Sequence, residues 1–289
     1  MKIDNAIIMA AGTSSRFAPI SYEKHKAFIE VNGEILIERQ IRQLKEAGIN
    51  DIIIVTGYLA EDFSYLKEKF QVKLIHNSEY LTRNNNGSIY AVRDYLKNSY
   101  ICSADNYFLQ NPFESETDDS YYSAVYSKGY TKEWCIYENT EGYITNVNIG
   151  GSNAWYMLGH TFWSEEFSNQ FINILDKIYD LPETKNYLWE NIFIQNLDTL
   201  KMKIRKYPDN IIFEFDTLDE LRLFDHSYIY DSRSKILKGI ADYLNTSEKD
   251  LINITAYKDN NNMAIGFQFD ANGQTYTYSY KDKNIRRIL

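Results

Sequence analysis

Short apolar runs alternate with stretches of helical periodicity over the first 110 residues, and this alternation restricts the fold more than any other feature. The apolar runs predict strands at residues 5–10, 51–56, 72–76 and 100–103. The residues that predict the helices between them are Leu36, Ile37, Ile41 and Leu44, ended by Gly48, and then Phe63, Leu66 and Phe70. Such an order favours right-handed crossovers, a mostly parallel sheet and helices on both of its faces.

The pattern changes after about residue 120. Four extended pieces, at residues 121–126, 134–137, 143–149 and 154–162, predict an antiparallel layer added to the sheet. Two helices follow, at 165–179 with Ser164 as N-cap and at 187–197. The remaining elements of this part are strands at 202–207 and 211–215 and a helix opened by a capping box at Thr217. We therefore predict an α/β fold with a Rossmann-like, mostly parallel mixed sheet.

The end of the chain differs in charge from the rest. The whole chain carries 31 Lys+Arg against 40 Asp+Glu, whereas residues 226–289 carry 9 against 7. This part predicts a helix at 234–244 and strands at 254–257, 264–270 and 274–280, with a hairpin at Asn272-Gly273. We place a domain boundary here, with a large domain at 1–228 and a small α+β C-terminal extension at 229–289.

Composition excludes several classes of protein. A net charge of −9 is a poor match to a nucleic-acid binder. No run approaches 18 apolar residues, so we expect neither membrane insertion nor a signal peptide. Only Cys102 and Cys135 are present, which favours a cytoplasmic setting and requires any metal site to use oxygen ligands.

The first predicted strand runs into a segment suited to binding phosphate. Its small or charged residues are Ala10, Ala11, Gly12, Thr13, Ser14 and Arg16, and Lys26 follows. Small residues let backbone N–H groups approach an anion, while Arg16 and Lys26 supply positive charge. The segment matches neither G-x-x-x-x-G-K-[ST] nor G-x-G-x-x-G. The alternative interpretation is a tight strand-to-helix turn with solvated charges.

Acidic residues follow two other predicted strands. Ala104, Asp105 and Asn106 end one of them, and Glu214 and Asp216 lie on the same side of another because side chains two apart in a strand share a face. Strand ends meet at one edge of such a sheet, so we predict a hard-cation site, with Mg²⁺ held by carboxylates and substrate phosphates. The alternative is that these acids are turn or cap residues.

These residues together resemble the nucleoside-triphosphate-transferase superfamily, and within it the bacterial CTP:phosphocholine cytidylyltransferases. The resemblance begins at MAAGTSSRF, covers about residues 1–225, and continues through EYLTRNNNGSIYAV, SADNYF, TKEWCIYE, LGHTFWS, LWENI and FEFDTLDEL. It implies a nucleotide-diphospho-sugar transferase type of fold. Two positions depart from the family pattern: Ser14 stands where glycine is frequent, and His25 where proline precedes the lysine.

The resemblance implies a role for each matching residue. Lys26, Arg16 and Asp105 would be catalytic, and Asp105, Glu214 and Asp216 would bind Mg²⁺. The implied nucleotide-binding residues are Ala10, Ala11, Gly12, Thr13, Ser14, Arg16, Asn84, Asn85, Ser88 and Ala104. The reaction would be transfer of CMP from CTP to a phosphomonoester, with release of pyrophosphate.

The acceptor is less restricted by the sequence. Glu133 beside Trp134 and Glu190 beside Trp189 suggest an aromatic and acidic box for the quaternary ammonium of phosphocholine, with Trp155 and Tyr187 as further candidates. Core packing is the alternative for each of these aromatic residues. Phosphoethanolamine, 2-aminoethylphosphonate and a sugar 1-phosphate remain open as acceptors. A non-catalytic nucleotide or choline sensor is the alternative from another class.

The C-terminal extension resembles the opening helix and first strands of choline-kinase-like phosphotransferases. It stops before any His-x-Asp catalytic motif, so we expect no phosphorylation activity from these residues. A front part of a longer fusion with a kinase domain is the interpretation that we favour. A homodimer is the alternative to this fusion, and the sequence offers no surface argument for it.

Overall fold

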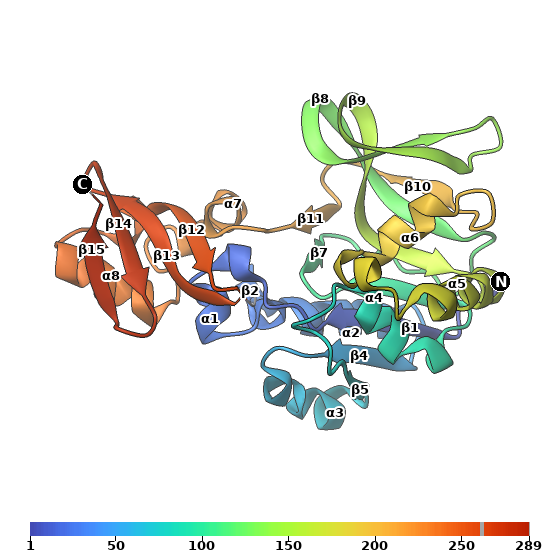
Figure 1. Cartoon of the computed structure of the whole chain (residues 1–289), viewed down its shortest axis with the longest axis horizontal. Helices are drawn as coiled ribbons and strands as arrows, with labels where there is room; N and C mark the ends of the chain where they lie inside the picture. The colour runs from blue at the N-terminus through green and yellow to red at the C-terminus, as the bar shows by residue number, and fades with distance from the viewer. Residues whose placement is uncertain (261–262, 289) are drawn as a thin grey trace. The chain divides into compact units, whose positions relative to one another are not determined.

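The computed structural model describes residues 1–260 and 263–288, which pack as two compact units (Figure 1). The first unit comprises Met1–Gly12 and Leu36–Glu214, and the second comprises Thr13–Ile35 and the chain from Phe215 onward. No helix within the described ranges is long and apolar enough to cross a membrane.

A seven-stranded mixed sheet, in the order β10-β8-β9-β6-β1-β4-β5, forms the centre of the first unit. Four neighbouring strands are parallel: β1 (Asn5–Ala10), β4 (Ile52–Thr56), β5 (Lys73–His76) and β6 (Ser99–Ser103). The other three are β8 (Tyr121–Glu138) and β9 (Ile144–Trp163), which are antiparallel to each other, and β10 (Lys203–Tyr207), which is parallel to β8. The predicted Rossmann-like mixed sheet is confirmed.

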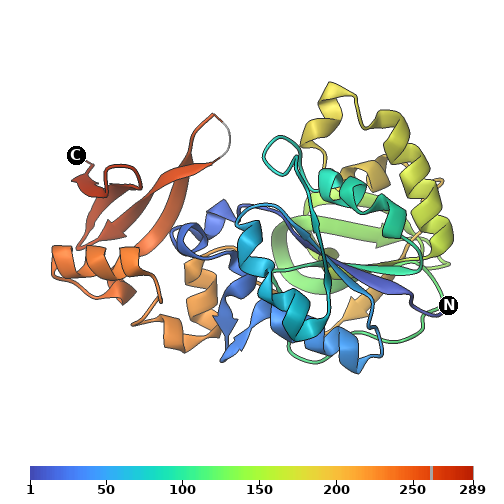
Figure 2. The same cartoon turned by 90° about the horizontal axis from the view of Figure 1, so that it is seen from below.

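Helices cover both faces of this sheet (Figure 2). On one face lie α4 (Asn86–Ala91), α5 (Glu165–Ile178) and α6 (Trp189–Gln195), which share a core with Ile7 and Ile53. On the other lie α2 (Leu36–Glu46) and α3 (Tyr65–Phe70). The short 3₁₀ helices of this unit are η3 (Ala60–Phe63), η4 (Arg93–Tyr95) and η5 (Pro182–Asn186). The central strands have an almost continuous apolar sequence because both faces are buried.

Some elements differ from the predictions. The four predicted extended pieces are two long strands, β8 and β9, whose pairing contains several bulges. Bulges let a strand continue through polar stretches that lack a regular alternation of apolar residues. Helix α4 and strand β7 (Asn106–Phe108) were not predicted, because elements of three to six residues carry little periodic signal. Strand β11 (Ile212–Glu214), which pairs antiparallel with β7, lies within the strand predicted at 211–215.

The second unit contains a four-stranded antiparallel sheet in sequence order. Its strands are β12 (Ile252–Lys258), β13 (Ala264–Ala271), β14 (Gln274–Ser279) and β15 (Asn284–Arg287), of which β15 was not predicted. Helix α8 (Lys235–Leu244) buries Leu237 and Ile240, and Figure 1 shows it along one face of the sheet. The β13–β14 turn is the predicted hairpin, with positive φ at both Asn272 and Gly273.

The remaining elements of the second unit connect the two chain segments that form it. They are α1 (Ile20–Glu23), β2 (Glu30–Val31), β3 (Glu34–Ile35), α7 (Leu218–Phe224), η1 (Ser15–Phe17), η2 (Lys26–Phe28), η6 (His226–Tyr228) and η7 (Glu248–Asp250). The backbone N–H of Asn32 donates to Asp225 Oδ2 at 2.9 Å, and the Tyr228 hydroxyl donates to the carbonyl of Glu30 at 2.7 Å. These contacts join residues 13–35 to the C-terminal residues in one compact unit. The predicted domains at 1–228 and 229–289 place these two segments in different domains. That boundary stays a prediction for the catalytic domain.

Candidate active site

A cavity of about 210 Å³ lies in the first unit, beside the carboxyl ends of β1 and β6. Five of the predicted nucleotide-binding residues line it: Ala11, Gly12, Asn84, Asn85 and Ser88. Five lining residues were not predicted: Met9, Asn77, Tyr80, Arg83 and Ser103. Of the other predicted residues, Ala10 ends β1, and the backbone N–H of Ala104 donates to the carbonyl of Met9 at 3.1 Å. Asn77 follows β5, so the rule that ligands lie beyond the carboxyl ends of strands was a signal for it.

One wall of the cavity depends on a glycine. A Cβ on Gly57 would lie 2.7 Å from the carbonyl oxygen of Ala11 and 2.7 Å from the Tyr80 side chain. The neighbouring backbone N–H of Tyr58 donates to that same carbonyl at 3.1 Å. Glycine therefore permits the close approach that brings Tyr80 to the cavity.

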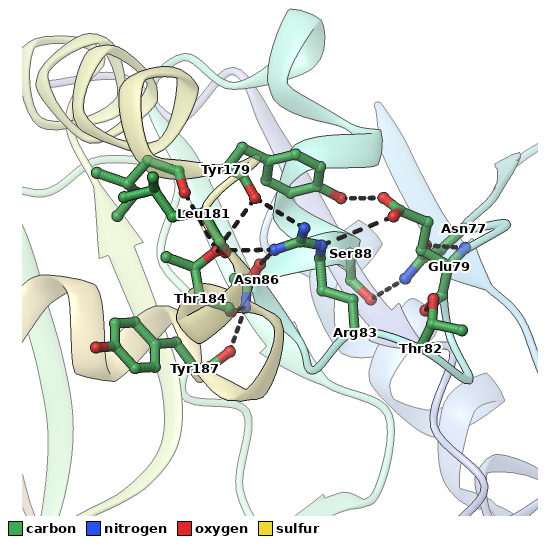
Figure 3. Close-up of polar contacts among 11 residues, drawn as sticks. Asn77, Glu79, Thr82, Arg83, Asn86, Ser88, Tyr179, Leu181, Thr184 and Tyr187 are labelled. Atoms are coloured by element: carbon green, nitrogen blue, oxygen red, sulfur yellow. Dashed lines mark hydrogen bonds and ion pairs between the residues drawn. The ribbon is translucent and has the colours of Figure 1, made fainter. Parts of the chain in front are cut away.

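A buried arginine, Arg83, also lines the cavity and is held by several hydrogen bonds (Figure 3). Arg83 Nη2 donates to the carbonyl of Tyr179 at 2.8 Å, and Nη1 donates to Thr184 Oγ1 at 3.1 Å. Its guanidinium carbon also lies 3.8 Å from the centroid of the Tyr179 ring. Asn86 Nδ2 donates to the carbonyl of Thr184 at 2.9 Å. These bonds fix residues 83–86 against η5, so Asn84 and Asn85 are presented from a rigid support.

Asn85 connects the cavity to helix α6. Its Oδ1 accepts a hydrogen bond from the Trp189 backbone N–H at 2.7 Å, and its Nδ2 donates to Glu190 Oε2 at 3.2 Å. The Tyr122 hydroxyl donates to the other Glu190 oxygen at 3.2 Å. Burial raises the pKa of the Glu190 carboxyl to about 7, although these two hydrogen bonds favour the charged form. Glu190 thus changes charge near neutral pH.

This raised pKa predicts a pH-dependent contribution to stability. Because the folded state favours the protonated form of Glu190, its contribution is complete below the ordinary pKa near 4.5 and is lost as pH rises through about 7. We expect the unfolding free energy of the wild type to fall, relative to that of Glu190→Gln, between pH 5 and pH 8. Urea denaturation of both proteins across this range measures the difference. Parallel pH profiles would contradict the assignment.

The structure gives the neighbours Glu133 and Trp134 different surroundings, and their joint role in an acceptor box stays a prediction. Trp134 packs against the apolar core, as Trp155 does, whereas Glu133 acts on Tyr156. Burial raises the pKa of the Tyr156 hydroxyl, and the Glu133 and Glu214 carboxylates raise it further. Adjacent residues of a strand point to opposite faces, which separates Glu133 from Trp134.

Trp189 is also a core residue, because only 1% of it is exposed. Its ring lies 5.0 Å from Trp163, 6.2 Å from Phe171 and 5.7 Å from Tyr122, measured between centroids. Direct contact of this ring with an acceptor therefore does not fit the structure. Tyr187 is partly buried against the same core. Sequence reasoning missed Tyr122 and Tyr156, since no motif distinguishes them among 25 tyrosines.

Two of the predicted metal ligands lie near the paired strands β7 and β11. Asp105 directly precedes β7 and its Oδ1 accepts a hydrogen bond from Ser103 Oγ at 2.6 Å. Glu214 is opposite Asn106 in the β7–β11 register, and Asn106 Nδ2 donates to its Oε2 at 3.4 Å. Across the described part of the chain, no three His, Cys, Asp or Glu side chains form a group suited to hold a metal ion. The metal-binding role of Asp105 and Glu214 stays a prediction.

The predicted phosphate-binding cations belong to the second unit together with Asp216. Arg16 Nη1 lies 2.7 Å from Asp216 Oδ2, and Lys26 Nζ lies 3.6 Å from Oδ1. The Arg16 side chain is 73% exposed, whereas that of Lys26 is 4% exposed.

The two departures from the family pattern lie in the same segment. Ser14 has a φ of +47°, the region that favours glycine. His25 Nδ1 accepts from the Ala27 N–H at 3.1 Å, so this departure from the family pattern caps η2. The predicted Thr13 also belongs to this unit.

Comparison with known proteins shows the family of the chain. Residues 6–113 match the MobA-like NTP transferase domain, and the chain is a nucleotidyltransferase. Choline-phosphate cytidylyltransferase of Streptococcus pneumoniae is 36% identical over 217 residues, which cover 75% of this chain and 95% of that protein. The chain therefore belongs to the choline-phosphate cytidylyltransferase family.

Two further relatives define the range of this similarity. The solved structure of CTP:phosphocholine cytidylyltransferase from S. pneumoniae superposes with a TM-score of 0.75 at 35% identity, covering 78% of this chain and 99% of that one. The 2-aminoethylphosphonate cytidylyltransferase of Lancefieldella rimae is 34% identical over 234 residues, which cover 80% of this chain and 95% of that protein. The nucleotide chemistry is common to these names, whereas the acceptor differs.

Proposed function

We propose that the protein is a Mg²⁺-dependent cytidylyltransferase that transfers CMP from CTP to phosphocholine. The observation that carries this proposal is the convergence of five predicted nucleotide-binding residues on one cavity, which Asn85 joins to Glu190. The names of two relatives, choline-phosphate and CTP:phosphocholine cytidylyltransferase, support the same choice of nucleotide and acceptor.

The reaction exchanges one phosphorus–oxygen bond for another. A phosphate oxygen of the acceptor attacks the α-phosphorus of CTP, and the bond from that phosphorus to the α,β-bridging oxygen breaks. The products are CDP-choline and pyrophosphate. The second pKa of a phosphomonoester is about 6, so the attacking oxygen is already anionic at neutral pH and needs no general base. Catalysis then depends on positioning and on neutralisation of charge.

Arg16 and Lys26 provide that neutralisation in the proposal. Lys26 is held in a nearly buried position, where water screens its charge little, and Asp216 balances it before substrate binds. Asp105 and Glu214, with Asp216, are the proposed ligands of Mg²⁺, which would supply Lewis-acid stabilisation of the phosphates. Carboxylate oxygens are ligands that this cation prefers, and one or two suffice when phosphates complete its coordination.

The acceptor region suits a positively charged amine. Its proposed acids are Glu133 and Glu190, and Tyr156 adds an aromatic ring and a hydroxyl group. Because Tyr122 and Trp189 are core residues and Trp134 and Trp155 pack against the core, recognition would rely on the carboxylates and on Tyr156. Carboxylates form charge-assisted hydrogen bonds with a primary ammonium and only Coulombic contacts with a quaternary one. This observation makes 2-aminoethylphosphonate the second candidate acceptor.

Pyrophosphate release with CTP and Mg²⁺ tests the proposal across phosphocholine, phosphoethanolamine, 2-aminoethylphosphonate and glucose 1-phosphate. We expect phosphocholine to give the highest kcat/KM and glucose 1-phosphate to be inactive, because it carries no ammonium group. A preference for 2-aminoethylphosphonate would support the second candidate. CTP binding with no turnover on any acceptor would replace the enzyme by a nucleotide sensor. Substituting UTP for CTP in the same assay tests the choice of base.

Three further proposals concern the setting of the protein. A cytoplasmic location suits Cys102 and Cys135, which are free thiols. A second copy of the chain and a fused kinase domain are the proposed partners beyond the substrates. The proposal of a kinase domain rests on the sequence resemblance of residues 229–289, which form helix α8 and the sheet β12–β15.

A further inference from the structure

The C-terminal extension contacts the segment that carries Arg16 and Lys26, within the second unit. The Tyr22 ring of α1 stacks on Tyr280, with centroids 3.8 Å apart and planes 7° from parallel. The Glu23 carboxylate accepts hydrogen bonds from the Ser234 hydroxyl and from the Lys235 backbone N–H. Two consecutive residues of α1 are therefore tied to two separate parts of the extension.

The extension also contacts the start of this segment and a residue after it. Strand β12 lies against η1, the turn that contains Arg16. Beyond Lys26, Arg233 Nη1 donates to Glu30 Oε2 at 3.1 Å. The extension thus contacts the turn that contains Arg16, helix α1 between Arg16 and Lys26, and Glu30 after Lys26.

Helix α1 depends on such contacts for its position. It is four residues long, and so short a helix is not stable without tertiary contacts. A cavity of about 710 Å³, lined by Tyr22, Glu23 and residues of α8, β14 and β15, lies beside it, and Tyr22 is 48% exposed. Ile20 and Ser21 of α1 are buried, whereas the exposed side of the helix, Tyr22 and Glu23, is held by directed contacts, the ring stack and the Glu23 hydrogen bonds.

We propose that residues 229–289 position Arg16 and Lys26 for the phosphates of CTP, and that Tyr22 and Glu23 transmit this effect. Lys26 follows Glu23 by three residues and opens η2, so a shift of α1 displaces the buried Lys26 ammonium relative to Asp216. Tyr22 and Glu23 are positioning residues, since neither is proposed to touch substrate. The inference rests on the proposed function for the identity of the ligand and on the contacts above for the coupling.

The test compares Tyr22→Ala with Tyr22→Phe in the full chain. Alanine removes the stack, whereas phenylalanine keeps it, so we expect KM for CTP to rise about fivefold in the first and to stay at the wild-type value in the second. The KM for the acceptor should not change in either. Tyr230→Ala, which removes another exposed ring of the extension, 68% exposed against 48% for Tyr22, is the control and should behave as the wild type.

A second readout does not depend on catalysis. Hydrogen–deuterium exchange at residues 20–28 should be faster in Tyr22→Ala than in the wild type and Tyr22→Phe, because the amide hydrogen bonds of Lys24 to Ile20 and Phe28 to His25 would open more often. Glu23→Gln replaces one acceptor oxygen by an NH₂ group and should also accelerate this exchange, which keeps the test decisive if Tyr22→Ala does not fold. Unchanged exchange and unchanged KM in both variants would overturn the proposal. A wild type inactive on every acceptor would instead overturn the proposed function, and the exchange data would still decide the coupling.

Discussion

Lys26→Met should lower kcat/KM for pyrophosphate release by about 100- to 1,000-fold, the loss that follows removal of one preorganised charge at a transition state. Methionine has nearly the length of lysine and no charge, so it suits a side chain that is 4% exposed. Asp216 keeps its ion pair with Arg16 in this variant, at 2.7 Å in the wild type. We therefore expect the fold to be retained, as circular dichroism and thermal unfolding would measure.

Lys24→Met is the matched control, because Lys24 is an exposed lysine two residues earlier in the same segment. Its kcat/KM should stay within about twofold of the wild type, since a solvated lysine contributes little. Equal activities of the two variants would remove Lys26 from the phosphate-binding set. A loss of folding in Lys26→Met alone would show that the ammonium is a structural partner of Asp216.

Asp105→Asn should lower kcat by a similar factor, about 100- to 1,000-fold, and raise the Mg²⁺ concentration needed for half-maximal activity. Asparagine keeps the shape of the side chain and an oxygen that accepts the hydrogen bond from Ser103 Oγ. The variant therefore removes charge from the proposed metal ligand while preserving its principal contact. A Mg²⁺ titration of pyrophosphate release, at saturating CTP and acceptor, measures both effects.

Asp62→Asn provides the control for this charge change, since Asp62 is exposed in η3 and belongs to no predicted site. We expect it to share the wild-type Mg²⁺ response. An Asp105→Asn protein with that same response would show that Asp105 does not hold the metal. Thermal unfolding of both variants separates loss of activity from loss of structure.

The sequence predicted the parallel core because the apolar runs of β1, β4 and β6 are continuous and separated by clear helical patterns. It was less successful for strands that lack a regular alternation of apolar and polar residues. Strands β8 and β9 pass through polar stretches with bulges, and β15 lies in a charged segment that has little apolar periodicity. In these regions pairing with a neighbouring strand decides the structure, and such pairing is not local in sequence.

The candidate site shows the same division. Residues at strand ends, such as Gly12 and Asp105, were predicted because a general rule of α/β sheets locates ligands there. The acceptor box was predicted from residues that are adjacent in sequence. Adjacency in a strand or helix directs neighbouring side chains to different faces, and of these residues Trp189 is buried in the core whereas Trp134 packs against it.

The sequence by itself determined the class of fold, and it predicts a phosphate-binding segment and acidic metal ligands, because each depends on local spacing and on a strand end. Only the tertiary structure decided which aromatic residues are buried, that Asn85 joins the cavity beside β1 and β6 to Glu190, and that the C-terminal extension contacts the segment bearing Arg16 and Lys26. These properties depend on contacts between different elements, from Phe171 with Trp189 to Tyr22 with Tyr280. Burial and desolvation, which set the charge of Glu190 and expel Trp189 from the site, arise only when such distant segments pack together.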